Sequence, residues 1–154
     1  MTELEKIAVT ALFTIVCGVV LFVIGQLFSK LLIEPVQALR HAIGEVRFNL
    51  AFHAPVIHTP AGRTTERSQK ARDALMKSSC DLLAKLHAVT LYSPISWLSM
   101  RILPKQQSIQ EAAKQLRGLS TYVNETGKEA VDNLEIIRSR VNCIEKLLYL
   151  KPFE

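Results

Sequence analysis

Histidine and cysteine are the side chains of this chain that could bind a metal ion or attack a substrate. His53 and His58 lie five residues apart in a proline-bearing stretch, with no cysteine or carboxylate beside them. Zinc sites need several ligands at short fixed spacings, such as Cys-x-x-Cys or His-x-x-x-His, and the chain has neither pattern. Cys80 and His87 are two helical turns apart, too far for a thiolate–imidazole pair. We therefore expect no metal, no cofactor and no catalytic residue among them.

Other catalytic patterns are also missing from the sequence. It has no Gly-x-x-x-x-Gly-Lys phosphate loop, no Gly-x-Ser-x-Gly elbow and no Gly-x-Gly-x-x-Gly turn. The acids after residue 30 lie mostly three or four residues from a base, the spacing of ion pairs on exposed helix faces. We predict that the chain is not an enzyme. An enzyme without a recognisable motif stays as an alternative to the two functions given at the end of this subsection.

Basic side chains gather between residues 85 and 117, where five bases accompany one acid. Nucleic-acid binding needs a denser basic stripe with exposed aromatic side chains, so we expect no nucleic-acid partner. Attraction to anionic lipid is the simpler reading, at roughly 1 kcal/mol per base near the surface. The apolar stretch between Pro94 and Pro104 either caps the bundle as a short helix or lies at the membrane surface. The second reading makes Trp97, Arg101 and Lys105 candidate lipid-interface residues.

The elements that hold these residues begin with residues 7–29, which contain no charged side chain. Twenty-three helical residues extend about 34 Å, slightly more than a hydrocarbon core of ~30 Å. A cleaved signal peptide would need a basic start, a shorter apolar stretch and a small-residue cleavage site, which are absent. We predict a short tail over residues 1–6 and an uncleaved transmembrane helix over 7–29.

Basic residues flanking this span predict its orientation. Lys30, Arg40 and Arg47 follow the span, whereas Lys6 alone precedes it. Because cytoplasmic flanks are enriched in bases, we expect the N-terminus outside and the remaining 125 residues in the cytoplasm. The two cysteines beyond the span would be free thiols in that reducing compartment.

Apolar and small residues recur every seven positions through the span and beyond it, at Gly18, Gly25, Leu32, Leu39 and Val46. This repeat predicts a juxtamembrane amphipathic helix over residues 30–52, kinked at Pro35. Its apolar face could form a coiled-coil dimer, lie on the membrane, or pack on the chain's own later helices. The third arrangement is the simplest.

Small residues inside the span favour close approach of two helices. Thr14 and Gly18 stand four residues apart, and Gly25 and Ser29 repeat that spacing. We therefore predict a possible homodimer, with Thr14, Gly18, Gly25, Leu32 and Leu39 as candidate helix-association residues.

Beyond residue 52 the sequence predicts a linker at 53–63 and a helical domain at 64–154. One helix is expected to start near Thr64 or Thr65, and a capping box at Ser108 is expected to start a later one. The tract from about 105 to 150 is either one helix or two that meet near Asn124. No stretch alternates with period two, so we expect an all-α protein: a transmembrane helix continuing into a juxtamembrane helix, then an antiparallel cytoplasmic helical bundle.

The stretch GQLFSKLLIEPVQALRHAIGEV, from Gly25 to Val46, resembles a pattern in small bacterial single-span membrane proteins. These share a Gly-Gln near the end of the span, followed by Glu-Pro and Gly-Glu. The resemblance covers about a seventh of the chain and implies a bacterial inner membrane, without implying an activity or a functional residue.

Two functions follow from these features. The first is a non-enzymatic, membrane-anchored interaction or scaffold protein that binds itself or another protein at the cytoplasmic face. The second is a membrane-perturbing effector of the toxin or phage-defence type, which oligomerises through its span.

Overall fold

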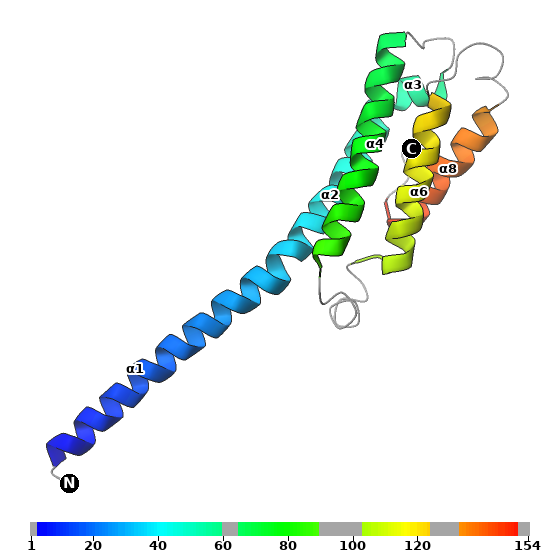
Figure 1. The fold of residues 1–154 in the computed structure, drawn as a ribbon. Helices are drawn as coiled ribbons and strands as arrows, with labels where there is room; N and C mark the ends of the chain where they lie inside the picture. The colour runs from blue at the N-terminus through cyan, green and yellow to red at the C-terminus, as the bar shows by residue number, and fades with distance from the viewer. Residues whose placement is uncertain (1–2, 60–64, 90–102, 124–132, 151–154) are drawn as a thin grey trace.

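The computed structural model describes residues 3–59, 65–89, 103–123 and 133–150, and every regular element in these ranges is helical. This confirms the predicted all-α class. Two helices lie in a single long rod, and the others pack as a bundle beside its distal half (Figure 1). The elements are α1 (Glu3–Phe28), η1 (Ser29–Ile33), α2 (Glu34–Phe52), α3 (Ala54–His58), α4 (Thr65–Ala88), α6 (Gln106–Val123) and α8 (Leu134–Leu147).

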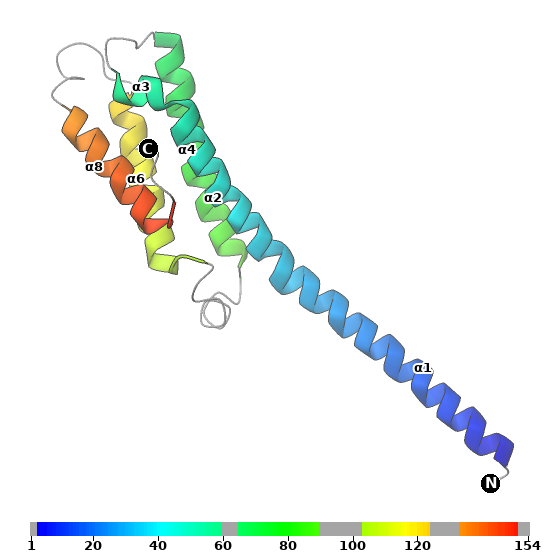
Figure 2. The ribbon, with the colours of Figure 1, turned by 180° about the vertical axis from the view of Figure 1, so that it is seen from behind.

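The first three elements form one continuous helix, in which η1 is a single π-helical turn. Pro35 causes this turn, because proline has no N–H and crowds the carbonyl four residues earlier. The N–H of Glu34 instead donates to the carbonyl of Ser29, five residues back. The helix therefore passes the proline without ending, and its direction changes where α1 gives way to α2 (Figures 1 and 2).

The π turn also divides the seven-residue repeat predicted from the sequence. A π turn holds about one residue more than an α turn, which rotates every later face by roughly 100°. Gly18 and Gly25 therefore do not share a face with Leu39 and Val46. The expected single seam is in fact two faces, one on α1 and one on α2.

Beyond η1 the helices form an antiparallel up-down-up-down bundle in the order α2, α4, α6 and α8. The chain reverses direction between successive helices, as the colours of Figures 1 and 2 show. Helix α4 packs on α2 and α6, and α6 packs on α4 and α8. Short helix α3 contacts α2, α4 and α8 at the end of the bundle away from α1. The expected linker over 53–63 thus contains the short helix α3. Pro55 lies in the first turn of α3, where proline is favoured because its missing N–H would have no partner within the helix.

The face of α2 predicted to be apolar packs within the chain. Leu39 and Val46 are fully buried, and Val36 and Ile43 pack at the margin of the same core. Of the three arrangements open from the sequence, the structure shows packing on the chain's own helices. The buried aliphatic side chains that complete this core come from every helix of the bundle, among them Leu75, Leu82, Leu116, Ile137 and Ile144.

Small polar side chains let the helices of the bundle approach closely. The Nδ2 of Asn49 on α2 donates to the Oγ of Ser78 on α4 over 2.8 Å. The Oγ of Ser79 donates to the carbonyl of Ala113 on α6, also over 2.8 Å, and Ser79 is fully buried. These bonds satisfy hydroxyl groups that would otherwise be buried at a cost.

The long C-terminal tract is two helices. Helix α6 ends at Val123, and α8 begins at Leu134 and runs back along it. Helix α6 also begins earlier than the Ser108 capping box predicts, because the N–H of Ile109 donates to the carbonyl of Lys105. The Glu111 carboxylate of that pattern accepts a bond from Gln115 instead.

Candidate functional site

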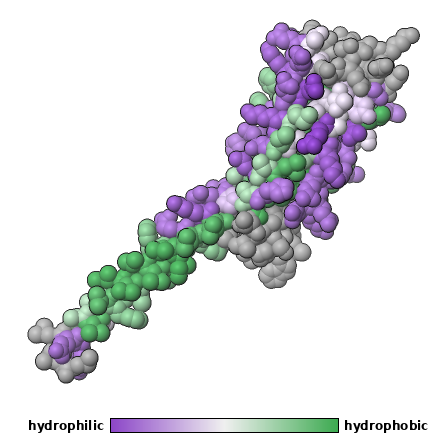
Figure 3. Space-filling model, viewed as in Figure 1, coloured by the Kyte–Doolittle hydropathy of each residue, from purple (hydrophilic) through white to green (hydrophobic). Residues whose placement is uncertain are grey.

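The surface of α1 beyond Lys6 carries no charged side chain and is mostly apolar. Within the described residues one helix is long and apolar enough to cross a membrane; its best window has a mean hydropathy of 2.9 and is not buried at all. Figure 3 shows this rod extending away from a mostly hydrophilic bundle. Large side chains of α1, such as Phe13, Leu21 and Phe22, are 66% or more exposed. Such a surface needs an apolar solvent or a partner.

The threonines of α1 satisfy their own hydroxyl groups. Thr10 Oγ1 donates to the carbonyl of Lys6 over 2.8 Å, and Thr14 Oγ1 donates to the carbonyl of Thr10 over 2.9 Å. Bonds to carbonyls four residues back are the usual way to keep a hydroxyl in a lipid-facing helix. The helix therefore presents no unpaired hydroxyl at Thr10 or Thr14.

The structure separates the candidate helix-association residues. Thr14, Gly18 and Gly25 lie exposed on α1, and a Cβ at either glycine would meet nothing within 4 Å. Leu39 is fully buried in the bundle core and so does not share the exposed surface of the α1 residues. Leu32 belongs to η1, and its side chain lies outside the described set.

Of the candidate lipid-interface residues, Trp97 and Arg101 lie outside the described residues. Lys105 is exposed and immediately precedes α6, at the end of the bundle nearest α1 (Figure 1). Lys85, in the last turn of α4, lies at the same end. Lys114 and Arg117, counted in the same basic segment, lie farther along α6.

The histidines and cysteines do not form a reactive cluster. Among the described residues no group of three metal-binding side chains could hold an ion. All three cysteines are free thiols. Burial lowers the pKa of His53, and burial together with the Arg138 guanidinium lowers the pKa of His58. Both imidazoles are thus biased toward the neutral form, and in the part of the chain that the structure describes neither forms an ion pair with a carboxylate that would make it a catalytic base.

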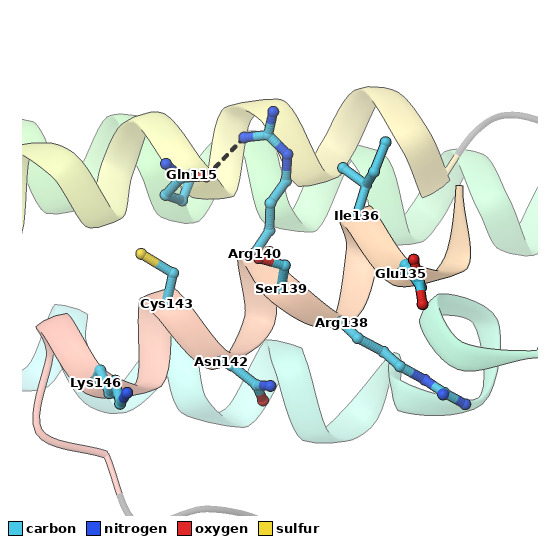
Figure 4. A pocket seen from close by; sticks show the side chains of 9 residues that line it. All are labelled: Gln115, Glu135, Ile136, Arg138, Ser139, Arg140, Asn142, Cys143 and Lys146. Atoms are coloured by element: carbon cyan, nitrogen blue, oxygen red, sulfur yellow. Dashed lines mark hydrogen bonds between the residues drawn. The ribbon is translucent and has the colours of Figure 1, made fainter. Parts of the chain in front are cut away.

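A surface hollow of about 1020 Å³ lies along α8 and one residue of α6 (Figure 4). Arg140 reaches from α8 to α6, where its Nη1 donates to the Oε1 of Gln115 over 2.7 Å. Arg138 points away from Arg140 in Figure 4, so the bases of this hollow do not converge on one point. We see a structural bridge between two helices here, and no arrangement for chemistry.

The groove between α2 and α4 is the better candidate. Phe48 and Phe52 stack on its α2 wall with ring centroids 5.6 Å apart, and the Phe52 ring meets His53 edge-on at 5.0 Å. Phe48 is 64% exposed and Phe52 is 67% exposed. These two large, adjacent, solvent-facing rings make this side of α2 a candidate interaction surface. The sequence carried a signal for them, since apolar residues four apart share a helix face, but the residue pattern draws attention to the other face.

Two hollows follow this groove on either side of the aromatic pair. One, of about 250 Å³, lies among Phe52, Pro55, Val56, Arg67 and Lys70. The other, of about 270 Å³, includes Phe48, Ala74 and Lys77. We call the two hollows together with the aromatic pair the α2/α4 groove.

These observations define a class of protein: an antiparallel helical bundle continuous with one long N-terminal apolar helix. No family model, curated protein or solved structure matches the chain. A function for this chain must therefore be inferred from its own residues.

Proposed function

We propose that this chain is a non-enzymatic, membrane-anchored interaction protein whose bundle lies in the cytoplasm, at the inner membrane of a bacterium. The observation that carries the proposal is the continuous helix from Glu3 to Phe52. Its first half is an exposed apolar rod, and its second half is one wall of the bundle. A membrane-embedded α1 would thus hold the bundle at a fixed distance from the lipid, which suits a scaffold that presents a binding surface.

Charge supports the orientation. Lys30, Lys85 and Lys105 lie at the junction with α1 or at the end of the bundle nearest it. Leu39 is only about 15 Å beyond Ser29 along the helix, so this end lies close to the headgroups. On the other side of the span, Lys6 is paired with Glu3 over 2.9 Å. The excess of bases beyond the span favours a cytoplasmic bundle.

Fusion reporters test this arrangement. A fluorescent protein fused after Glu154 should fold and emit, whereas a periplasmic phosphatase at that position should be inactive. The chain should also stay in the membrane pellet after carbonate washing. An active phosphatase would refute the orientation, and release by carbonate would refute the anchor.

The bare glycines of α1 favour a homodimer and keep the second function open. Gly18 and Gly25 leave room for a neighbouring helix to approach the backbone closely. A membrane-perturbing effector would use this face to form a larger assembly, and its overexpression would collapse the membrane potential. An interaction protein would leave the potential unchanged, so a potential-sensitive dye separates the two functions.

A further inference from the structure

We infer that the end of the bundle nearest α1 binds the headgroups of anionic phospholipids in the membrane that α1 crosses. This inference deepens the proposed function and rests on it, because it takes α1 to be embedded in that membrane. Four bases at this end, all exposed except the half-buried Lys85, carry the inference: Lys30, Arg40, Lys85 and Lys105.

Two hydrogen bonds between helices place the last three of these bases at one level. Asn49 of α2 donates to Ser78 of α4, and Ser79 of α4 donates to the carbonyl of Ala113 of α6. Because the helices are antiparallel and rise equally, counting about eight residues from these bonds toward α1 reaches a base on each, within about one residue. We call this level and the residues between it and α1 the basal layer: 30–41, 85–89 and 103–107.

The basal layer is positively charged. It contains four bases and one acid, Glu34, so its formal net charge is +3 with the histidines neutral. The next layer away from α1 contains three bases and four acids, in residues 42–48, 78–84, 108–114 and 143–147. The positive charge is therefore concentrated at the end that faces the membrane, where it attracts anionic lipid.

The bases of the basal layer are available to a phosphate. Lys85 lies 3.9 Å from Asp81, whereas Lys30, Arg40 and Lys105 form no ion pair in the part of the chain that the structure describes. Side chains of a helix lean toward its N-terminus, so Arg40 of α2 leans toward α1 and the lipid. The positive end of the α6 dipole lies beside Lys105 and favours the same anion.

The membrane surface is close enough for this attraction. Arg40 lies eleven residues beyond Ser29, or about 16 Å along the helix axis. Headgroups fill about 5–8 Å of that distance. The remaining gap is comparable with the Debye length of about 8–10 Å at physiological salt, and an extended arginine side chain shortens it further. The far end of the bundle, about 18 Å farther along α2, lies beyond this range.

The full-length chain in lipid nanodiscs tests the inference. We would place a fluorescent amino acid at Gln107, which is exposed in the first turn of α6, and measure its quenching by lipids with nitroxide headgroups. Discs of phosphatidylcholine are compared with discs in which one third of the lipid is phosphatidylglycerol. The anionic discs should increase quenching at least about twofold, because each base near an anionic surface favours contact. The same group at Thr59, exposed at the far end, is the matched control and should not respond to the lipid.

Charge reversal and salt make the test specific. Arg40→Glu with Lys105→Glu should abolish the increase, whereas Arg67→Glu with Arg72→Glu should preserve it. The second pair makes the same change of charge at exposed positions toward the far end of α4. High salt should abolish the increase in the native chain, which needs no substitution and so does not depend on the folding of a variant.

Several results would overturn the inference. They are equal quenching in the two kinds of disc, an increase that persists in high salt, and equal losses in the two variant pairs. Loss of the increase on adding inorganic phosphate at constant ionic strength would assign the site to a free anion instead. Co-elution of the chain with the discs reports the anchor separately, so failure of the basal layer and failure of the proposed function are distinguishable.

Discussion

Arg140 of α8 lies across the backbone of Gly118 on α6, where a Cβ at Gly118 would overlap its guanidinium. The same guanidinium bonds Gln115 and lies 5.3 Å from the centroid of the Tyr122 ring. Glycine in a helix interior costs about 1 kcal/mol relative to alanine. Glycine at position 118 therefore lowers the stability of helix α6 but leaves the space that the Arg140 guanidinium occupies.

This relationship predicts a coupling between the two positions. In an Arg140→Ala background, Gly118→Ala should stabilise the bundle by about 1 kcal/mol, because the helix gains and nothing is displaced. In the native chain the gain should be largely cancelled, because the guanidinium must leave Gln115 and Tyr122. Urea unfolding of the detergent-solubilised chain measures both effects in a double-mutant cycle. Equal gains in the two backgrounds would show that Arg140 makes no use of the space.

The sequence predicted the helices better than it predicted the contacts between them. Apolar residues at spacings of three and four identify α2, α4, α6 and α8, because each helix buries one stripe. The π turn depends on a single residue, Pro35. A helix can accommodate a proline by ending, by kinking or by widening into a π turn, and the residue alone does not determine which of these occurs. The Gly118–Arg140 contact joins residues 22 positions apart on antiparallel helices, which no local pattern reports.

The spacing of the aromatic pair places both rings on one face of a helix, but it does not show that this face is exposed. Phe48 and Phe52 read as two more apolar residues of a helix whose buried stripe is already full. Only the exposure of both rings in the folded bundle distinguishes them from core residues.

Ser79 tests the close approach of α4 and α6. Replacing it with alanine should cost about 1 kcal/mol, the typical net value of one hydrogen bond, here the bond to Ala113. Ser79→Leu should cost about 1–3 kcal/mol, because the site is fully buried and has no room for the larger side chain. Cys80 is the matched control, since it is adjacent and exposed. Cys80→Ala should change the free energy of unfolding by less than about 0.5 kcal/mol; equal effects at both positions would contradict the packing.

The left-handed backbone conformation of Tyr149 leads us to expect a stabilising substitution at this position. It has φ = 54° just beyond the end of α8, while the N–H of Leu150 bonds the carbonyl of Glu145 and that of Tyr149 bonds Lys146. This is a Schellman motif, whose left-handed position favours glycine. Tyr149→Gly should raise the free energy of unfolding by about 1 kcal/mol, because the ring is 69% exposed and its loss removes little packing. Tyr149→Ala retains the strain and should bring no such gain.

The histidines at the far end of the bundle predict a loss of stability on mild acidification. The folded-state pKa of both His53 and His58 lies below the ordinary value of 6.5. As the pH falls through 6.5, the unfolded chain binds protons that the folded chain resists, so the free energy of unfolding decreases. Urea titrations between pH 7.5 and 5.5 should show this decrease, and His58→Gln should reduce it.

Two controls assign this effect to the imidazoles. Arg138→Gln should also reduce the decrease, because the guanidinium contributes to the lowered pKa of His58. Glu66 and Glu111 have pKa values lowered by hydrogen bonds from Lys70 and Gln115, respectively. Their contributions are present above pH 4.5 and are lost only as the pH falls through their lower folded values, outside the measured window. A slope unchanged by His58→Gln would assign the pH dependence elsewhere.

The π turn separates association from folding, and the two should respond to different substitutions. Leu39→Ala should cost about 2–5 kcal/mol of bundle stability, because Leu39 is fully buried in the core. It should leave self-association in the membrane unchanged, since Leu39 does not share a face with the glycines of α1.

Gly18→Leu with Gly25→Leu should have the opposite effect. The leucines fill the space above both glycines, so a membrane two-hybrid signal should fall several-fold while urea unfolding of the bundle stays the same. Val16→Leu with Val23→Leu is the matched control, because these residues have the same spacing on the opposite side of α1. If Leu39→Ala weakened association as much as the Gly18→Leu/Gly25→Leu variant does, one association face would have to continue from α1 into α2. The division of that face at η1 would then be wrong. Loss of signal in the valine pair would instead show that bulk anywhere on α1 is enough, and that the glycine face has no special part in association.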